Sequence, residues 1–266
     1  EAYDPEPDSD AEEWAQRYGL EPQTVNPFGG AAVYCGLVAV CDGREQTIAK
    51  FNPASETTLE YDITRLVTRV AWPEKPVIGV MSALPVLGSP RNPMMMGREQ
   101  APDRGWIAFQ NLRKDFTLRA ISPDVPEIDP SVKVLIVVHP TDLPEKTLFA
   151  IDQFVLRGGR LVACVDPFCV TELMANRQNP MMMNGAGGAS TLGKLFDAWD
   201  VTFAPAKLAA DLGCATALNG GDGQAEQNPL FLSLGVANLS KTDLLTADLS
   251  QIMLPFAGAL SFRPSK

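Results

Sequence analysis

The chain has 266 residues, 45% hydrophobic and 20% charged, which supplies enough apolar residues for one large core or two smaller ones. A formal net charge of -10 argues against binding of nucleic acid or anionic lipid through bulk electrostatics. No apolar stretch approaches the roughly 20 residues that a membrane helix needs, and because the chain starts at Glu1 without a methionine, we expect a fragment excised from a longer precursor.

Residues 1–72 are predicted to form an amino-terminal helix-hairpin-helix unit. Acidic residues crowd the first turns and favour the start of a helix that runs to about Tyr18. The Asp42-Gly43 pair lies between apolar runs at 33–40 and 46–51, which is typical of a hairpin. A second helix is expected at 59–70. This order is similar to the second half of a thioredoxin-like domain, although redox function is not expected because no paired cysteines are present.

Residues 73–266 are predicted to form the second domain. Aliphatic strands are expected at 77–81, 117–121, 134–138 and 161–165. Helices are expected at 106–115, from Pro144 to Gly158-Gly159, and near 191–199. Strands that alternate with helices predict an α/β fold with a doubly wound, mostly parallel sheet. Beyond Phe203, a loop at 219–223 is expected, and the short apolar runs 230–234 and 252–254 are not assigned a type.

Three polar residues follow strands of the predicted sheet: Ser82, His139 and Asp166. Open parallel sheets place ligand crevices outside the carboxyl ends of their strands, so these residues are candidates for ligand binding. They could also supply the nucleophile, base and carboxylate of a hydrolase. The glycines of a nucleophile elbow are absent around Ser82, however, and small polar residues also end strands simply by satisfying backbone groups.

The pentapeptide Asn-Pro-Met-Met-Met occurs twice, at 92–96 and 179–183, each time after a predicted parallel strand. Methionine adapts to irregular partners, so these loops could form a flexible apolar lid or docking surface. This surface would comprise Met94, Met95, Met96, Met181, Met182 and Met183. Thioether ligation of Cu(I) and a pair of plain surface loops are the alternatives. Consecutive side chains diverge and no histidine or cysteine lies beside them, which weighs against copper.

The five cysteines form no Cys-x-x-Cys pair and no zinc spacing. Most are expected to be buried structural thiols, including Cys164, which lies within a predicted core strand. No metal site and no cofactor are predicted.

The segment 134–168 resembles the auxiliary component of gliding-motility-type ABC transport systems. It begins with Val-Leu-Ile-Val-Val-His-Pro and ends with Val-Asp-Pro-Phe. Shorter segments match the same family in the same order, at 34–38, 59–65, 74–80, 198–201 and 254–260. The resemblance covers nearly the whole chain.

This resemblance implies a non-catalytic accessory domain at the periplasmic face of the inner membrane, held between membrane helices that are missing from this fragment. Its expected partners are an ABC-2-type permease and its ATPase, and it is expected to bind a protein partner or an exported substrate. The second domain is expected to have the class I glutamine amidotransferase-like, or flavodoxin-like, fold. Glycan binding is an alternative that rests on this fold analogy alone.

The resemblance implies no enzyme. Amidotransferases of this fold use a cysteine at an elbow and a histidine later in the chain, whereas His139 precedes Cys164 and Cys169 here. No phosphate-binding loop motif occurs, so ATP hydrolysis is assigned to a partner subunit.

Overall fold

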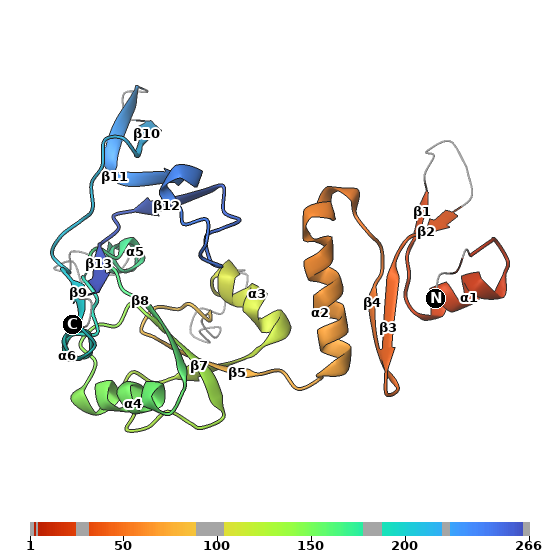
Figure 1. Ribbon diagram of the computed structural model, residues 1–266, viewed down its shortest axis with the longest axis horizontal. Coiled ribbons are helices and arrows are strands. Elements are labelled where there is room, and N and C mark those ends of the chain that lie inside the picture. Colours follow the sequence, from red (N-terminus) through yellow and green to blue (C-terminus); the bar gives the residue numbers. More distant parts are fainter. Residues whose placement is uncertain are drawn as a thin grey trace, which may run out of the picture. The chain divides into compact units, whose positions relative to one another are not determined.

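The computed structural model covers most of the chain (Figure 1). The residues that it describes are 3, 5–24, 32–88, 104–177, 188–219 and 224–262. The chain divides into two compact units, Glu1–Lys75 and Pro76–Lys266. Both Asn-Pro-Met-Met-Met segments lie outside the described residues, so the docking surface expected at their methionines stays a prediction.

The first unit opens with helix α1 (Asp10–Arg17), which confirms the predicted amino-terminal helix. Ser9 caps its start, because the Ser9 hydroxyl accepts a hydrogen bond from the Glu12 N–H at 3.2 Å. The next two strands, β1 (Pro22–Thr24) and β2 (Ala32–Tyr34), pair antiparallel.

The predicted hairpin is confirmed by the antiparallel strands β3 (Leu37–Cys41) and β4 (Arg44–Ile48). Asp42 and Gly43 join them with φ values of 50° and 76°, and two successive positive φ angles are what a tight type I′ turn requires. The apolar run 33–40 contains parts of two strands, β2 and β3, which are interrupted near Gly36. A Cβ atom on Gly36 would lie 2.6 Å from a backbone carbonyl oxygen, so only glycine permits this approach.

Helix α2 (Leu59–Ala71) confirms the helix predicted at 59–70. It follows the short 3-10 helix η1 (Pro53–Thr58), contacts both β3 and β4, and buries Leu66 and Val70.

A four-stranded parallel sheet lies at the centre of the second unit. In spatial order its strands are β6 (Thr117–Ile121), β5 (Val77–Ser82), β7 (Val132–Val138) and β8 (Arg160–Cys164). All three pairings are parallel, which confirms the strands predicted from the aliphatic runs. Because parallel neighbours cannot be joined by a tight turn, longer connections cross the faces of the sheet.

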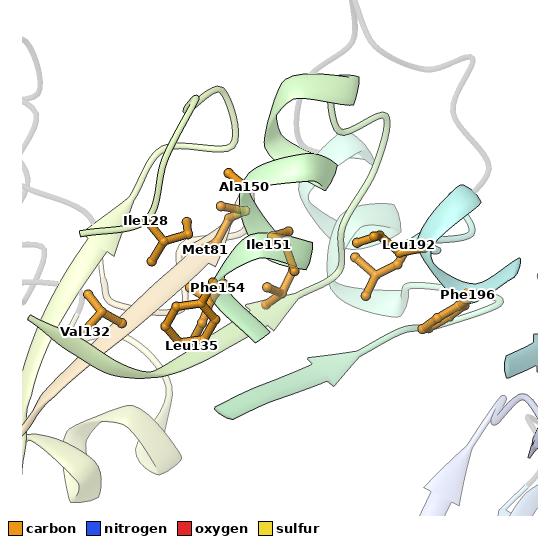
Figure 2. Close-up of a cluster of buried hydrophobic side chains, with 11 residues drawn as sticks. Met81, Ile128, Val132, Leu135, Ala150, Ile151, Phe154, Leu192 and Phe196 are labelled. Carbon is orange, nitrogen blue, oxygen red and sulfur yellow. The ribbon is translucent and has the colours of Figure 1, made fainter. Parts of the chain in front are cut away.

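Helix α4 (Glu145–Leu156) covers one face of this sheet (Figure 2). Met81 and Leu135 of the sheet lie in one buried cluster with Ile151 and Phe154 of the helix. The helix predicted after Pro144 is therefore confirmed. It ends before Gly158-Gly159, where Gly158 has a φ of 89° and a Cβ on Gly159 would lie 2.4 Å from the Phe154 ring.

Helix α3 (Ile107–Asp115) belongs to a second buried cluster, which contains the alternate side chains of the same strands. Phe109 of this helix packs with Ile78, Val80 and Val138. Along β5 and β7, successive side chains thus point into different clusters, as the two-residue repeat of a strand requires. The second unit is therefore a mixed α/β unit whose parallel sheet has a helix-covered core on each face.

Short helices follow the sheet. Helix α5 (Val170–Arg177) was not predicted, and α6 (Lys194–Ala198) is shorter than the helix expected near 191–199. The remaining elements are β9 (Val201–Phe203), β10 (Ala215–Asn219), β11 (Ala225–Gly235), η4 (Val236–Asn238), β12 (Gln251–Pro255) and β13 (Leu260–Phe262). Strands β10, β11 and β12 form an antiparallel sheet, and β13 pairs with β9. The two unassigned apolar runs are strands that pair with each other, with Leu232 opposite Leu254.

The expectation that most cysteines are buried is wrong. Cys169 is buried, whereas Cys35 and Cys164 are exposed. Cys164 pairs with Val138 in the register of the sheet and so faces the α3 side. No side chain of β8 belongs to the cluster on that side, whereas Leu118 of the other edge strand, β6, packs against it. Cys164 therefore reaches solvent even though it lies in a sheet strand.

Candidate functional site

The carboxyl ends of β5, β7 and β8 lie in one row. Ser82 pairs with Val138, and Val138 pairs with Cys164, so the chain segments that leave these strands start from the same edge of the sheet. The order of the strands reverses between β5 and β7, since β6 lies on one side of β5 and β7 on the other. Their connections therefore leave in different directions, and open α/β sheets form ligand crevices at such a point.

A small pocket lies at this point of reversal. It has a volume of about 20 Å³, which is room for about one water molecule or the tip of one small side chain. We call it the rim pocket; it is lined by Met81, Ser82, Ala83, Pro123, Val137, Val138, His139, Pro140, Thr141 and Leu143. The structure thus brings Ser82 and His139 to one pocket, as the sequence predicted. Asp166 is not among the lining residues.

His139 is the most constrained residue of the rim pocket. Its backbone has a φ of 51°, and its N–H donates to the carbonyl oxygen of Cys164 at 2.9 Å, so the end of β7 is tied to the end of β8. The side chain is only 4% exposed. Its Nε2 atom lies 3.2 Å from Oε2 of Glu172, whereas its Nδ1 atom is buried without a hydrogen-bond partner among the described residues. A buried imidazole nitrogen without a partner is unusual and calls for an explanation.

Glu172 lies in the first turn of α5 and orients His139. The same oxygen that contacts His139 also accepts a hydrogen bond from the Gly188 N–H at 2.7 Å. Glu172 therefore connects the end of β7 to the segment that precedes α6. The sequence prediction missed this residue, because it gave no helix at 170–177 and nothing marked a pairing with His139.

Asp166 follows β8 and is held by its backbone. Its N–H donates to the hydroxyl of the fully buried Ser190 at 2.8 Å, and its carbonyl oxygen accepts from the Ser190 N–H at 2.7 Å. Its Oδ1 accepts from the Phe168 N–H at 2.9 Å. Burial raises the pKa of the Asp166 carboxyl, while the Phe168 N–H and the nearby His139 act in the opposite direction. Ser190 is a second residue that the sequence prediction missed.

The hydrogen bonds of a serine-histidine-aspartate relay are absent among the described residues. The Ser82 hydroxyl accepts from the Leu84 N–H at 3.1 Å, which is a local turn contact at the end of a strand. His139 contacts Glu172 rather than Asp166. A relay needs its base bonded to the nucleophile on one side and to the carboxylate on the other, so these three residues do not form one.

Cys169 follows Asp166 by three residues, and it is buried. Burial raises the pKa of the Cys169 thiol, and the carboxylates of Asp166 and Glu172 act in the same direction, while the backbone N–H groups of Glu172 and Thr171 act in the opposite direction. The thiol therefore stays protonated at neutral pH and lacks the thiolate of a nucleophilic cysteine. Among the described residues, no group of three or more histidine, cysteine, aspartate or glutamate side chains could hold a metal ion.

Family comparison agrees with the resemblance seen in the sequence. A family model described as an ABC-type uncharacterized transport system matches residues 75–266, which is more than half of the chain and includes the whole parallel sheet. The chain belongs to the ABC-type uncharacterized transport system family. It is therefore an auxiliary component associated with an ABC transport system. Neither a curated protein nor a solved structure matches it.

Membership of the ABC-type uncharacterized transport system family associates the chain with a membrane system. Within the residues that the structure describes, no helix combines the length and the apolar character needed to cross a bilayer.

Proposed function

We propose that the second domain, residues 73–266, is a non-catalytic accessory domain that binds a protein partner or an exported substrate at the rim pocket. Asp166 and the two methionine segments, at Met94–Met96 and Met181–Met183, flank the binding surface in this proposal. The domain serves a gliding-motility-type ABC-2 transport system at the periplasmic face of the inner membrane. Its partners are the permease and the ATPase, and a parent protein with membrane helices anchors it.

The proposal rests on the burial, the position and the hydrogen bonding of His139. This residue is 4% exposed, is among those that line the rim pocket, and has a ring nitrogen without a partner among the described residues. It also lies where the strand order reverses, which is where open α/β sheets bind their ligands. A binding role accounts for both its position and its unsatisfied nitrogen.

We also propose a specific fold for each of the two domains. Numbered along the chain, the four parallel strands occupy the order 2-1-3-4, which is the order of flavodoxin-like sheets. This order supports a class I glutamine amidotransferase-like fold for the second domain. In the first domain, residues 1–72, the β3–β4 hairpin followed by α2 supports a partial thioredoxin-like unit.

Photo-cross-linking tests this function in cells that express the whole parent protein with its transport system. A photoreactive phenylalanine analogue replaces Ala83, which is exposed and lines the rim pocket. The control carries the same analogue at Ala237, an exposed residue of η4 that does not line the rim pocket. We expect a discrete adduct from position 83 and none from position 237. Mass spectrometry then identifies the captured molecule as a partner subunit or an exported substrate.

Equal labelling from the two positions, or no adduct from position 83, would contradict the proposal. In either case the rim pocket would have no specific occupant.

A further inference from the structure

We propose that the rim pocket recognises a hydrogen-bond donor, an amine or hydroxyl group, and that Glu172 sets this preference by fixing the tautomer of His139. This inference rests on the proposed binding function of the rim pocket and specifies the chemistry of its ligand. Glu172 is here a positioning residue, since it acts through the imidazole.

The contact with Glu172 determines which nitrogen of the His139 imidazole carries the proton. An ionised carboxylate only accepts hydrogen bonds, and Oε2 of Glu172 already accepts one from the Gly188 N–H at 2.7 Å. The contact of 3.2 Å between this oxygen and Nε2 of His139 is then a hydrogen bond only if Nε2 carries the proton. In its neutral form the imidazole has one donor nitrogen and one acceptor nitrogen, so with the proton on Nε2 the acceptor is Nδ1.

The acceptor nitrogen of His139 lacks a hydrogen-bond donor in the part of the chain that the structure describes. Nδ1 is buried and has no partner among the described residues, and His139 is one of the residues that line the rim pocket. Leaving a buried acceptor unpaired is unfavourable, and a ligand that brings an N–H or O–H group would satisfy it. A ligand group with only lone pairs would instead be repelled by the lone pair of Nδ1.

The surroundings of the rim pocket limit the size and the charge of the group that it can bind. Most lining residues are apolar, and the volume of about 20 Å³ admits only one small end group. Carboxyl groups lie near this pocket: Oε2 of Glu172 is 3.2 Å from Nε2 of His139, Asp166 follows β8, and Asp142 lies between the lining residues Thr141 and Leu143 in the sequence. These groups favour a neutral or cationic donor over an anion. An amine or hydroxyl at the end of a partner side chain or of an exported molecule fits this description.

The single histidine of the chain makes the tautomer directly measurable. In nitrogen-15 NMR spectra of the purified protein at about pH 8, where an ordinary imidazole is neutral, we expect His139 to carry its proton on Nε2. Glu172→Ala should convert this signal into that of a mixture of tautomers. Glu226→Ala, at an exposed position of β11, should leave it unchanged. Circular dichroism verifies that both variants remain folded.

Three small probes then test the ligand class: ethylamine, ethanol and acetate. We expect a saturable shift of the Nδ1 resonance with ethylamine or ethanol, no such shift with acetate, and loss of the response in Glu172→Ala. A proton on Nδ1 in the unmodified protein, a saturable response to acetate alone, or no saturable response to any probe would each overturn the inference.

The two proposals fail in different experiments. A specific adduct at position 83 without the NMR response would leave a binding pocket of different chemistry. Absence of the adduct would remove the binding function itself.

Discussion

At the scale of single residues, Asp166 makes the stability of the protein depend on pH. Burial raises the pKa of its carboxyl, so the folded protein keeps this proton to a higher pH than the unfolded chain does. Well below the ordinary value of 3.8, both states are protonated and the group has no effect. As the pH rises through the folded pKa, the folded state must ionise a buried group, and stability falls.

Replacement of Asp166 by asparagine should therefore stabilise the protein at neutral pH. The amide oxygen of Asp166→Asn can still accept from the Phe168 N–H, while the buried charge is removed. We expect a higher free energy of unfolding than the unmodified protein at about pH 7, and a smaller difference at about pH 4, as measured by urea denaturation at both values.

Asp129→Asn is the control, because it should act in the opposite direction. The pKa of Asp129 is lowered by its hydrogen bonds with Ser131 and by Arg119. Its ionised form therefore stabilises the folded state above the ordinary pKa, and that contribution is lost as the pH falls. If Asp166→Asn destabilised the protein more at neutral pH than in mild acid, the sign assigned to Asp166 would be wrong.

At the scale of elements, helix α4 offers the same substitution on its buried and exposed faces. Phe154 is 2% exposed and packs in the cluster on the sheet, whereas Phe149 of the same helix is 63% exposed. Phe154→Ala should lower the free energy of unfolding by about 3–5 kcal/mol, because it removes buried apolar contacts and leaves a cavity. Phe149→Ala should change it by less than about 0.5 kcal/mol.

Urea denaturation of the two variants, with their midpoints compared at equal slope, measures this difference. Similar losses from both substitutions would mean that α4 does not bury the face seen in the structure.

At the scale of the whole molecule, the second unit contains complete cores of its own. Every residue of its two buried clusters comes from 77–203. By contrast, the buried hydrophobic residues described in the first unit are Ala15, Leu66 and Val70. Each described sheet of that unit has two strands, and two-stranded sheets are marginally stable by themselves.

Residues 76–266 expressed alone should therefore fold and unfold cooperatively. We expect a single thermal transition by circular dichroism and a well-dispersed NMR spectrum, whereas residues 1–75 alone should show neither. A molten or aggregated 76–266 fragment would show that its clusters are insufficient for folding without the first unit.

Local sequence signals were sufficient to predict the parallel sheet. Its strands are continuous aliphatic runs, and prolines, glycines and polar residues mark where the helices begin and end, so each element could be recognised without its neighbours. The same signals were insufficient for β10–β13, whose side chains are largely half-buried or exposed and so lack a clear apolar run. They also did not predict that Cys164 is exposed, since this depends on which strands the cluster around α3 covers.

The sequence predicted that Ser82 and His139 share one edge of the sheet, but it did not predict which side chains pair there. The shared edge of parallel strands was enough to bring Ser82 and His139 to one pocket. Glu172, however, lies 33 residues after His139, and their contact depends on how α5 packs against the end of β7. No local pattern encodes such a contact, so the sequence suggested Asp166 as the acid where the structure places Glu172.

The left-handed backbone of His139 has a consequence for how this position can evolve. Glycine adopts a φ of 51° freely and asparagine tolerates it, whereas a residue with a branched Cβ is strained there by about 1 kcal/mol or more. Selection for stability alone would therefore permit a small group of residues here, namely glycine, asparagine, aspartate and histidine. An imidazole that is retained among relatives, although the other three residues are equally permitted by the backbone, would indicate selection for what the side chain binds.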